Sequence, residues 1–203
     1  MKQIAIFTIT IFLFSSFCDA AERKESVCHG DPANGSLENG WQLPSAGANY
    51  EAYSSVGVMA DRNYVHSKVY EVVVHAYAVL EAQAPGKHFV YGESGYKEGG
   101  KFRPHKTHQN GLSVDFFVPV TDAAGRSVPL PTSVLNKLGY NIEFNDSAQY
   151  EGLTIDFEAM AKHLVALKQA ADQAGVGIPP DYPQLIRHRH TRHGRPPTRG
   201  QTL

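Results

Sequence analysis

The sequence predicts an α+β fold in which helices flank a small antiparallel sheet and an extended N-terminal segment comes first. Residues 62–85 and 156–175 repeat apolar side chains at helical spacing. Residues 112–120 alternate apolar and polar side chains, as a half-buried strand does. Helices and strands do not alternate regularly, so the parallel sheet of an α/β protein is not expected.

The first half of the chain supplies one helix and one strand. Residues 28–60 are rich in Gly, Ser, Asn and Pro without a clear period, so we expect an extended segment anchored by Trp41. The helix within 62–85 ends at a Pro-Gly pair, and His75 lies at the edge of its apolar stripe. Residues 87–94 are rich in β-forming side chains and predict a strand that ends in a turn.

The second half continues with the alternating strand 112–120, a short helix within 131–139 and a strand at 140–144. The helix at 156–175 is the strongest prediction, because Asp156 is a natural N-cap and Gly175 a natural end. His163 borders its apolar stripe and is expected to be structural. The predicted stripe consists of Phe157, Met160, Ala161, Leu164, Leu167 and Ala171.

Residues 1–20 predict a signal peptide that is cut after Ala20. A lysine at position 2 precedes an eleven-residue apolar run, which is too short to span a membrane, and "CDA" is a plausible cleavage site. A retained anchor and a lipoprotein through Cys18 are the alternatives. Cleavage predicts a periplasmic protein without a membrane span. It leaves Cys28 alone in an oxidising compartment, which indicates a missing partner, an intermolecular bridge or a free thiol.

Composition separates one domain at 21–178 from a tail at 179–203. The tail holds five arginines, five prolines and three histidines but one acid and no lysine, so we expect it to be disordered. The chain lacks phosphate-binding Gly-rich loops, a Gly-x-Ser-x-Gly nucleophile motif and Cys-x-x-Cys pairs. No basic patch outside the tail indicates nucleic acid.

The stretch "FRPHKTHQNGLSVDFF", residues 102–117, carries the candidate chemistry. His105 and His108 lie three residues apart, Gly111 permits a tight turn, and Asp115 falls on the polar face of the predicted strand. A half-buried carboxylate is costly without a cation or donor. His108 and Asp115 are therefore candidate zinc ligands, whose ligand atoms we expect about 3–4 Å apart. The alternative is a polar turn with Asp115 bonded to nearby backbone.

The stretch "GGKFRPHKTHQNGLSVDF", with "NGWQLPSAG" and "HSKV", resembles the penicillin-insensitive murein endopeptidases, within the wider group of lysostaphin, D-Ala-D-Ala and hedgehog-like zinc metallopeptidases. The resemblance extends from about residue 28 to about residue 177. It implies Zn²⁺ held by His108 and Asp115, and hydrolysis of D-Ala–diaminopimelate cross-links in peptidoglycan. His105 would move the proton or orient substrate. Such an enzyme would be insensitive to penicillin, because it has no serine nucleophile that a β-lactam could acylate.

The same resemblance implies a His-x-His pair on a late strand and a cysteine that pairs with an early one. His188-Arg189-His190 matches the pair literally, so His190 is the candidate third ligand and His188 its catalytic companion. Proline has no backbone N–H to donate to a strand ladder, so the prolines of the tail disfavour a strand. We therefore expect residues 179–203 not to complete the sheet, Cys28 to be a free thiol, and endopeptidase activity to be low.

A frameshifted or truncated gene end would explain the break in composition. Two alternatives to an active endopeptidase remain open. One is a catalytically impaired relative that binds murein without cleaving it, and the other is a D,D-carboxypeptidase of the same group.

Overall fold

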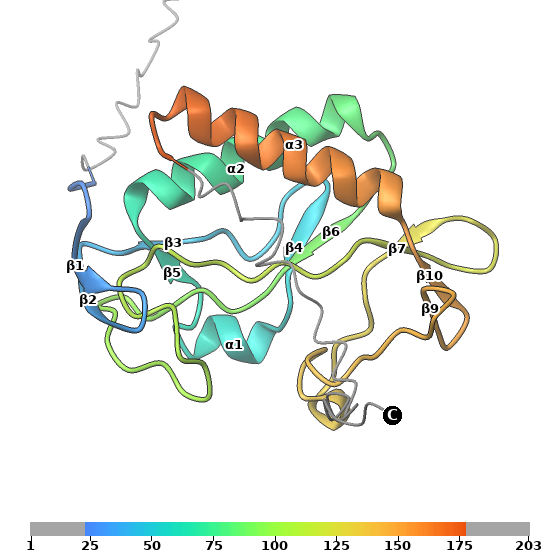
Figure 1. Cartoon of the computed structure of the whole chain (residues 1–203), viewed down its shortest axis with the longest axis horizontal. Coiled ribbons are helices and arrows are strands. Elements are labelled where there is room, and N and C mark those ends of the chain that lie inside the picture. The colour runs from blue at the N-terminus through green and yellow to red at the C-terminus, as the bar shows by residue number, and fades with distance from the viewer. Residues whose placement is uncertain (1–22, 178–203) are drawn as a thin grey trace, which may run out of the picture.

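The computed structural model describes residues 23–177 (Figure 1). The predicted signal peptide and the predicted tail lie outside these residues. The elements, in chain order, are β1 (Val27–Asp31), β2 (Asn34–Glu38), β3 (Trp41–Gln42), β4 (Tyr50–Ala52), α1 (Ser55–Met59), β5 (Tyr64–Val65), α2 (Ser67–Gln83), β6 (Phe89–Tyr91), β7 (Val120–Thr121), β8 (Ser127–Val128), the 3-10 helix η1 (Val134–Asn136), β9 (Gln149–Tyr150), β10 (Leu153–Ile155) and α3 (Phe157–Gln173).

The α+β prediction is confirmed: the described elements are three α-helices, a short 3-10 helix and small sheets that are mostly antiparallel. The largest of these sheets has the order β8-β7-β10-β9, and Val120 at its centre pairs with both Val128 and Ile155. Two further antiparallel pairs are β1–β2 and β3–β5. The pair β4–β6 is parallel, and the chain crosses between its strands through α2.

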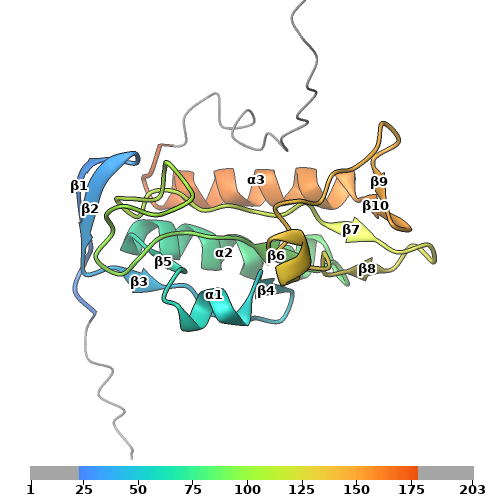
Figure 2. The same ribbon diagram turned by 90° about the horizontal axis from the view of Figure 1, so that it is seen from below.

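Helices α2 and α3 lie side by side and form one layer of the molecule, with the strands beneath them (Figures 1 and 2). Both predicted helices are present, within one to five residues of the expected starts. Asp156 caps α3 as predicted, accepting a 2.9 Å hydrogen bond from the Ala159 N–H. Helix α2 begins later than expected because Tyr64 and Val65 form β5 and His66 becomes its N-cap.

The buried side of α3 differs from the predicted stripe. Phe157 is 57% exposed, whereas Ala159, Ala166 and Ala170 are buried. Small side chains allow α3 to approach α2 closely, so the alanines occupy the contact. His163 lies within this buried side and is 4% exposed, which confirms its structural role.

Residues 28–60 contain more regular structure than the predicted extended segment. Strands β1 and β2 form a hairpin in register from Val27↔Glu38 to Asp31↔Asn34. The Asp31 carboxylate closes its turn by accepting from the N–H groups of Ala33 and Asn34 at 2.8 and 2.9 Å. Trp41 lies edge-on to Tyr70 of α2 at 5.3 Å between ring centroids, where it anchors the segment that follows the hairpin.

The predicted strand 112–120 is wrong in its extent. Only its last residue belongs to a named strand, and Phe116 forms an isolated antiparallel bridge with Tyr91. The Asp115 N–H still donates to the Glu93 carbonyl at 3.0 Å, and its carbonyl accepts from Gly92 at 2.7 Å. This backbone pairing does not continue from Asp115 to Ser113, because the Ser113 carbonyl faces the His108 ring instead. Alternation holds locally, since Phe116 packs on His163 of α3 and Asp115 therefore points away from the helices.

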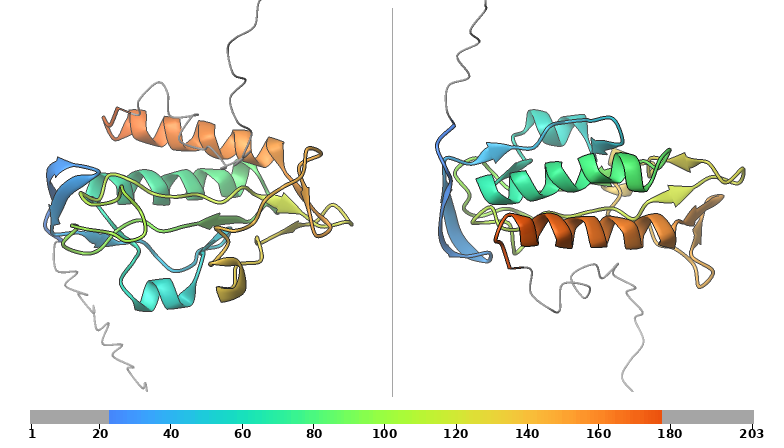
Figure 3. Two further views of the ribbon diagram at one scale, coloured as in Figure 1. Left: turned by 60° about the horizontal axis from the view of Figure 1, so that its bottom comes forward. Right: turned by 90° about the horizontal axis from the view of Figure 1, so that it is seen from above.

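The segment 131–144 also departs from its prediction. A 3-10 turn, η1, replaces the expected helix, and residues 140–144 form no strand. The Asn136 side chain holds this bend by accepting from the N–H groups of Ser133 and Gly139, each at 2.8 Å. Helices α1 and η1 lie on the side opposite to α2 and α3 (Figure 3, left). The bend directs Tyr140 toward Asp115.

Candidate metal centre

Three candidate site residues converge beyond the C-terminal end of β6. His105, His108 and Asp115 each offer a ligand atom, and these atoms all lie within 4.8 Å of one another. His108 Nε2 is 3.4 Å from Asp115 Oδ1, which falls within the expected range of about 3–4 Å. His105 Nδ1 lies farther away, 3.9 Å from Asp115 Oδ2. The histidine on the loop is thus brought over the aspartate.

His108 is fixed by its backbone surroundings and is only 2% exposed. Its Nδ1 lies 3.1 Å from the Ser94 carbonyl and 3.2 Å from the Ser113 carbonyl. These acceptors place the ring proton on Nδ1, so the Nε2 lone pair faces Asp115. Burial opposes protonation of His108, but the Asp115 carboxylate outweighs burial and raises its pKa.

The backbone that delivers His108 bends sharply. His108 has a φ of 76°, in the left-handed region that non-glycine residues seldom adopt. Gly111 follows with a φ of 75°, and a Cβ there would lie 2.8 Å from the His66 nitrogen. Glycine is therefore required at 111 for close approach as well as for the turn.

The second carboxylate oxygen of Asp115, Oδ2, is held by a hydrogen bond from Tyr140. The Tyr140 hydroxyl donates to Asp115 Oδ2 at 2.8 Å and accepts from the Glu93 N–H at 3.2 Å. Burial and the neighbouring Asp115 charge raise the pKa of Tyr140, so it remains a neutral donor. Gly92 makes room for this contact, because a Cβ there would lie 2.9 Å from the Asp115 Cβ. Oδ1 is thereby left to face His108.

His105 is held by a buried carboxylate. Its Nε2 hydrogen-bonds Glu93, which is 6% exposed and also accepts from Arg62 Nε and, at 2.9 Å, from the Tyr53 hydroxyl. Burial alone would raise the pKa of Glu93, but the hydrogen bonds from His105, Arg62 and Tyr53 outweigh it and lower the pKa to about 2. Glu93 is therefore ionised and keeps the His105 proton on Nε2, which leaves Nδ1 facing Asp115.

Sequence reasoning did not identify four of these residues: Tyr53, Arg62, Glu93 and Tyr140. The available signal for Glu93 was a single acid just after the apolar run 89–91, where a carboxylate has to find donors when it is buried. His188 and His190, the candidate catalytic companion and third ligand, lie outside the described residues. Cys28 forms no disulfide within residues 23–177.

The family model for penicillin-insensitive murein endopeptidases matches residues 28–177, almost the whole described range. The chain belongs to this family. Membership makes it a murein endopeptidase relative, and it implies a peptidase type of hydrolase, a peptidoglycan substrate and action outside the cytoplasm. A search of curated proteins finds no match.

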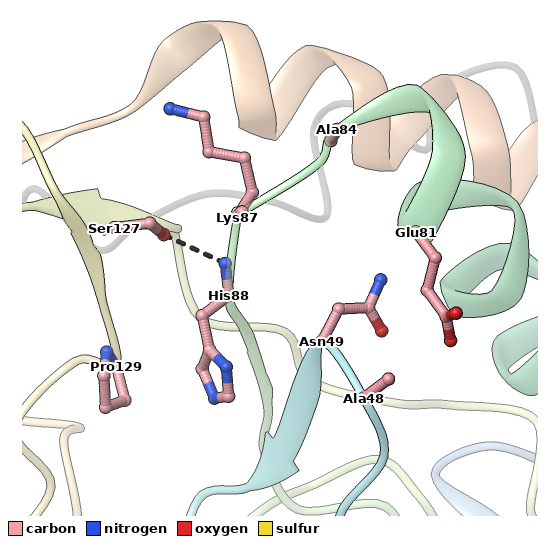
Figure 4. A pocket seen from close by; sticks show the side chains of 9 residues that line it. Ala48, Asn49, Glu81, Ala84, Lys87, His88, Ser127 and Pro129 are labelled. Carbon is pink, nitrogen blue, oxygen red and sulfur yellow. Dashed lines mark hydrogen bonds between the residues drawn. The ribbon is translucent and has the colours of Figure 1, made fainter.

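A separate hollow of about 410 Å³ opens at the other end of β6 in this murein endopeptidase relative (Figure 4). Asn49, Lys87 and His88 line it, and the Ser127 hydroxyl accepts from the His88 N–H at 2.9 Å. None of the three clustered residues lines this hollow. Between residues 23 and 177, no helix combines the length and apolar character needed to cross a membrane.

Proposed function

We propose that this protein is a zinc-dependent D-alanyl–diaminopimelate endopeptidase that hydrolyses murein cross-links. The observation that supports this most directly is the 3.4 Å separation of His108 Nε2 and Asp115 Oδ1. The other nitrogen of His108 and the other oxygen of Asp115 are already engaged by hydrogen bonds. Both groups are therefore preorganised to face one point between them.

The donor set fits zinc. Two ligands bound tetrahedrally at the usual distances lie about 3.3 Å apart, close to the separation of the His108 and Asp115 atoms. A bound zinc would lower the pKa of a water molecule and polarise the scissile carbonyl. His105 Nδ1 lies 3.9 Å from Asp115, outside that spacing, so we assign it a role beside the ligands. His190 is the candidate third ligand and His188 its candidate catalytic companion, and both lie outside the described residues.

His105 would carry the proton of the reaction. Its free Nδ1 accepts a proton from the attacking water, whose oxygen forms the new bond to the D-Ala carbonyl carbon. The carbon–nitrogen bond then breaks, and His105 returns the proton to the diaminopimelate amine. Glu93 stabilises the positive charge on the imidazole between these two transfers, because it is ionised and hydrogen-bonded to Nε2.

A non-cleaving murein-binding relative is the second candidate. Within the described part of the chain, His108 and Asp115 are the pair of clustered residues whose ligand atoms lie at metal-ligand spacing, and a catalytic zinc needs three protein ligands. The low activity that we expect from the composition of the tail belongs to this alternative. A D,D-carboxypeptidase would use the same pair but release terminal D-alanine, so product analysis separates it from an endopeptidase.

The proposed place of action is the periplasm, reached by cleavage of residues 1–20. A murein substrate and the predicted signal peptide support this location together. The measurement is N-terminal sequencing of the protein recovered from a periplasmic extract. A chain that begins at residue 21 is expected, and an intact N-terminus retained in the cytoplasm would contradict the proposal.

The test of the proposed function is a paired measurement of zinc and hydrolysis. Native mass spectrometry gives the zinc content of the full chain, and digestion of purified sacculi with product analysis gives the reaction, each with and without chelator. The variants are His108→Ala and His190→Ala, with exposed His75→Ala as the control. Loss of zinc and of cross-link cleavage in both variants, but not in the control, would establish an active endopeptidase with His190 as its third ligand. Zinc binding without cleavage by wild type would establish the non-cleaving alternative.

A further inference from the structure

The loop that carries the site histidines concentrates unpaired positive charge. Residues 97–106 contain four basic side chains and one acid, whereas acids outnumber bases in the rest of 23–177. These four basic residues, which we call the loop cations, are Lys97, Lys101, Arg103 and Lys106. All four are exposed, and none lies within ion-pair distance of a described carboxylate.

Most basic side chains elsewhere in the described domain are neutralised. Six of them form ion pairs with acids: Arg62, Lys68, Lys87, Arg126, Lys162 and Lys168. Arg23, Lys24 and Lys137 also form no ion pair with a described acid, but they lie far from residues 97–106 in the sequence. The sequence alone showed no patch of the kind that binds nucleic acid. The structure adds that the positive charge of this short loop is left without local partners.

The loop backbone is held in place, so the backbone positions of the loop cations are defined. Phe102 is fully buried, with the Arg62 guanidinium 4.0 Å from its ring centroid. Arg62 also donates to the Arg103 carbonyl at 2.9 Å. The Gly100 N–H donates to the Gln109 carbonyl at 2.8 Å, which closes the loop.

Two of the loop cations flank His105 directly. Lys106 is its neighbour and Arg103 lies two residues before it, so their Cα atoms are within about 7 Å of that of His105. The proposed reaction places the leaving amine at His105. An anion attached close to that amine would therefore meet these side chains, and a guanidinium is well suited to bind a carboxylate through two hydrogen bonds.

Diaminopimelate supplies such an anion. The carbon that bears its cross-linked amine also bears a carboxylate, which lies next to the scissile amide. Lysine, the corresponding residue in other cross-linked peptides, has only hydrogen on that carbon. The two cross-links thus differ in one negative charge beside the amine that the proposed reaction places at His105.

We propose that the loop cations form a carboxylate-recognition surface that selects cross-links with a free carboxylate on the amine side of the scissile bond. This rests on the proposed function, because it takes His105 as the residue beside the leaving amine. Among the loop cations, Arg103 and Lys106 would contact the carboxylate, while Lys97 and Lys101 add long-range attraction. The loop is thereby a determinant of specificity for diaminopimelate over lysine.

The experiment compares three synthetic cross-linked stem-peptide dimers: one with diaminopimelate, one with lysine, and one with diaminopimelate whose adjacent carboxylate is converted to the amide. Isothermal titration of the metal-free full chain with each dimer measures binding without hydrolysis. The test variants are Arg103→Gln and the triple change Lys101→Gln, Arg103→Gln, Lys106→Gln. Lys168→Gln on α3 is the charge-matched control. The five arginines of the tail are unchanged throughout, so any binding that they contribute is constant.

Wild type is expected to bind the diaminopimelate dimer about 10-fold more tightly than either analogue that lacks the adjacent carboxylate at low salt, since exposed ion pairs contribute up to about 5-fold each. Arg103→Gln should remove about half of this preference on a logarithmic scale, and the triple variant all of it. Lys168→Gln should keep it. The preference should shrink as ionic strength rises.

Equal affinity of wild type for the three dimers overturns the proposal, as does a preference that survives in the triple variant. Binding to anionic phospholipid vesicles as strong as binding to the diaminopimelate dimer would overturn it in favour of a membrane surface. Sacculus digestion with zinc is scored separately. Discrimination without hydrolysis supports the recognition surface and counts against catalysis, whereas hydrolysis without discrimination does the reverse.

Discussion

The imidazole of His105 is bonded through Nε2 to Glu93, a carboxylate that is 6% exposed and ionised in the folded protein. This bond determines which His105 nitrogen faces Asp115. His105 lies in an exposed loop region, but its orientation is set by the buried Glu93, which follows β6. The same carboxylate accepts from Arg62 and Tyr53, so the position of one histidine depends on three separate segments of the chain.

The two histidines are expected to separate metal binding from proton transfer. His108→Ala should lose zinc, because it removes the imidazole that faces Asp115 at 3.4 Å. His105→Ala should keep zinc and lower the rate of cross-link hydrolysis by about 10²–10⁴-fold, the usual contribution of a positioned acid–base group. Zinc content by mass spectrometry and sacculus digestion measure the two effects. Loss of zinc from His105→Ala would make this residue a ligand instead.

Glu93→Gln is expected to lower the free energy of unfolding by about 3 kcal/mol, because it leaves the Arg62 guanidinium without its buried counter-charge. Urea denaturation measures the change. The control is Glu158→Gln, which removes an acid from an exposed pair with Lys162 and should leave the midpoint unchanged. If both variants unfold at the wild-type midpoint, the Glu93 network does not stabilise the fold.

Tyr140→Phe is expected to weaken zinc binding by about 10–100-fold, because it removes the donor that orients Asp115. The aromatic contacts of the ring are kept, so the fold should be retained. Competition with a chromophoric chelator measures the affinity. Tyr150→Phe on β9 is the matched control, and equal affinities in the two variants would show that Asp115 needs no such support.

The stability of the protein is expected to fall at mildly acidic pH because of His163. Burial among Tyr77, Phe89 and Phe116 lowers the pKa of His163 to about 3, below its ordinary value of 6.5. The unfolded chain binds the proton first, so the stabilising effect is complete above pH 6.5 and is lost as pH falls toward 3. The free energy of unfolding should drop by at most about 1.4 kcal/mol for each pH unit in this window.

Urea titrations at several pH values measure this slope in wild type and in His163→Phe. The variant should show a shallower slope between pH 6.5 and 3, whereas His75→Phe on the exposed side of α2 should keep the wild-type slope. Glu93 adds its own loss only below pH 4.5, the ordinary pKa of its carboxyl, since its folded pKa is about 2. An unchanged slope in His163→Phe would contradict the assignment.

The two long helices could be predicted because seventeen residues contain enough turns to show a period. Strands of two or three residues, such as β7 and β9, are too short to show alternation, and their pairing depends on distant segments. For this reason the expected strands at 112–120 and 140–144 were wrong. The stripe on α3 was misjudged at Phe157 because size predicts burial poorly where alanines bring two helices together.

The core of the candidate site was predictable because His105, His108, Gly111 and Asp115 occur within eleven residues. Their spacing around one turn suffices to suggest a cluster. The supporting residues were not predictable in this way. Tyr140 lies 25 residues from Asp115 and Tyr53 lies 40 residues from Glu93, and no local pattern links such pairs. Their roles arise only from tertiary contacts.

The backbone of His108 has a consequence for protein engineering. At a φ of 76°, this position favours glycine or asparagine, and holding another residue there costs about 1–3 kcal/mol. The backbone and the imidazole therefore place opposite demands on one residue. Directed evolution that selects for heat resistance alone would favour glycine or asparagine at position 108, because either residue removes the backbone strain. The histidine would then be lost. A thermostable variant of this protein has to be selected for both properties at once.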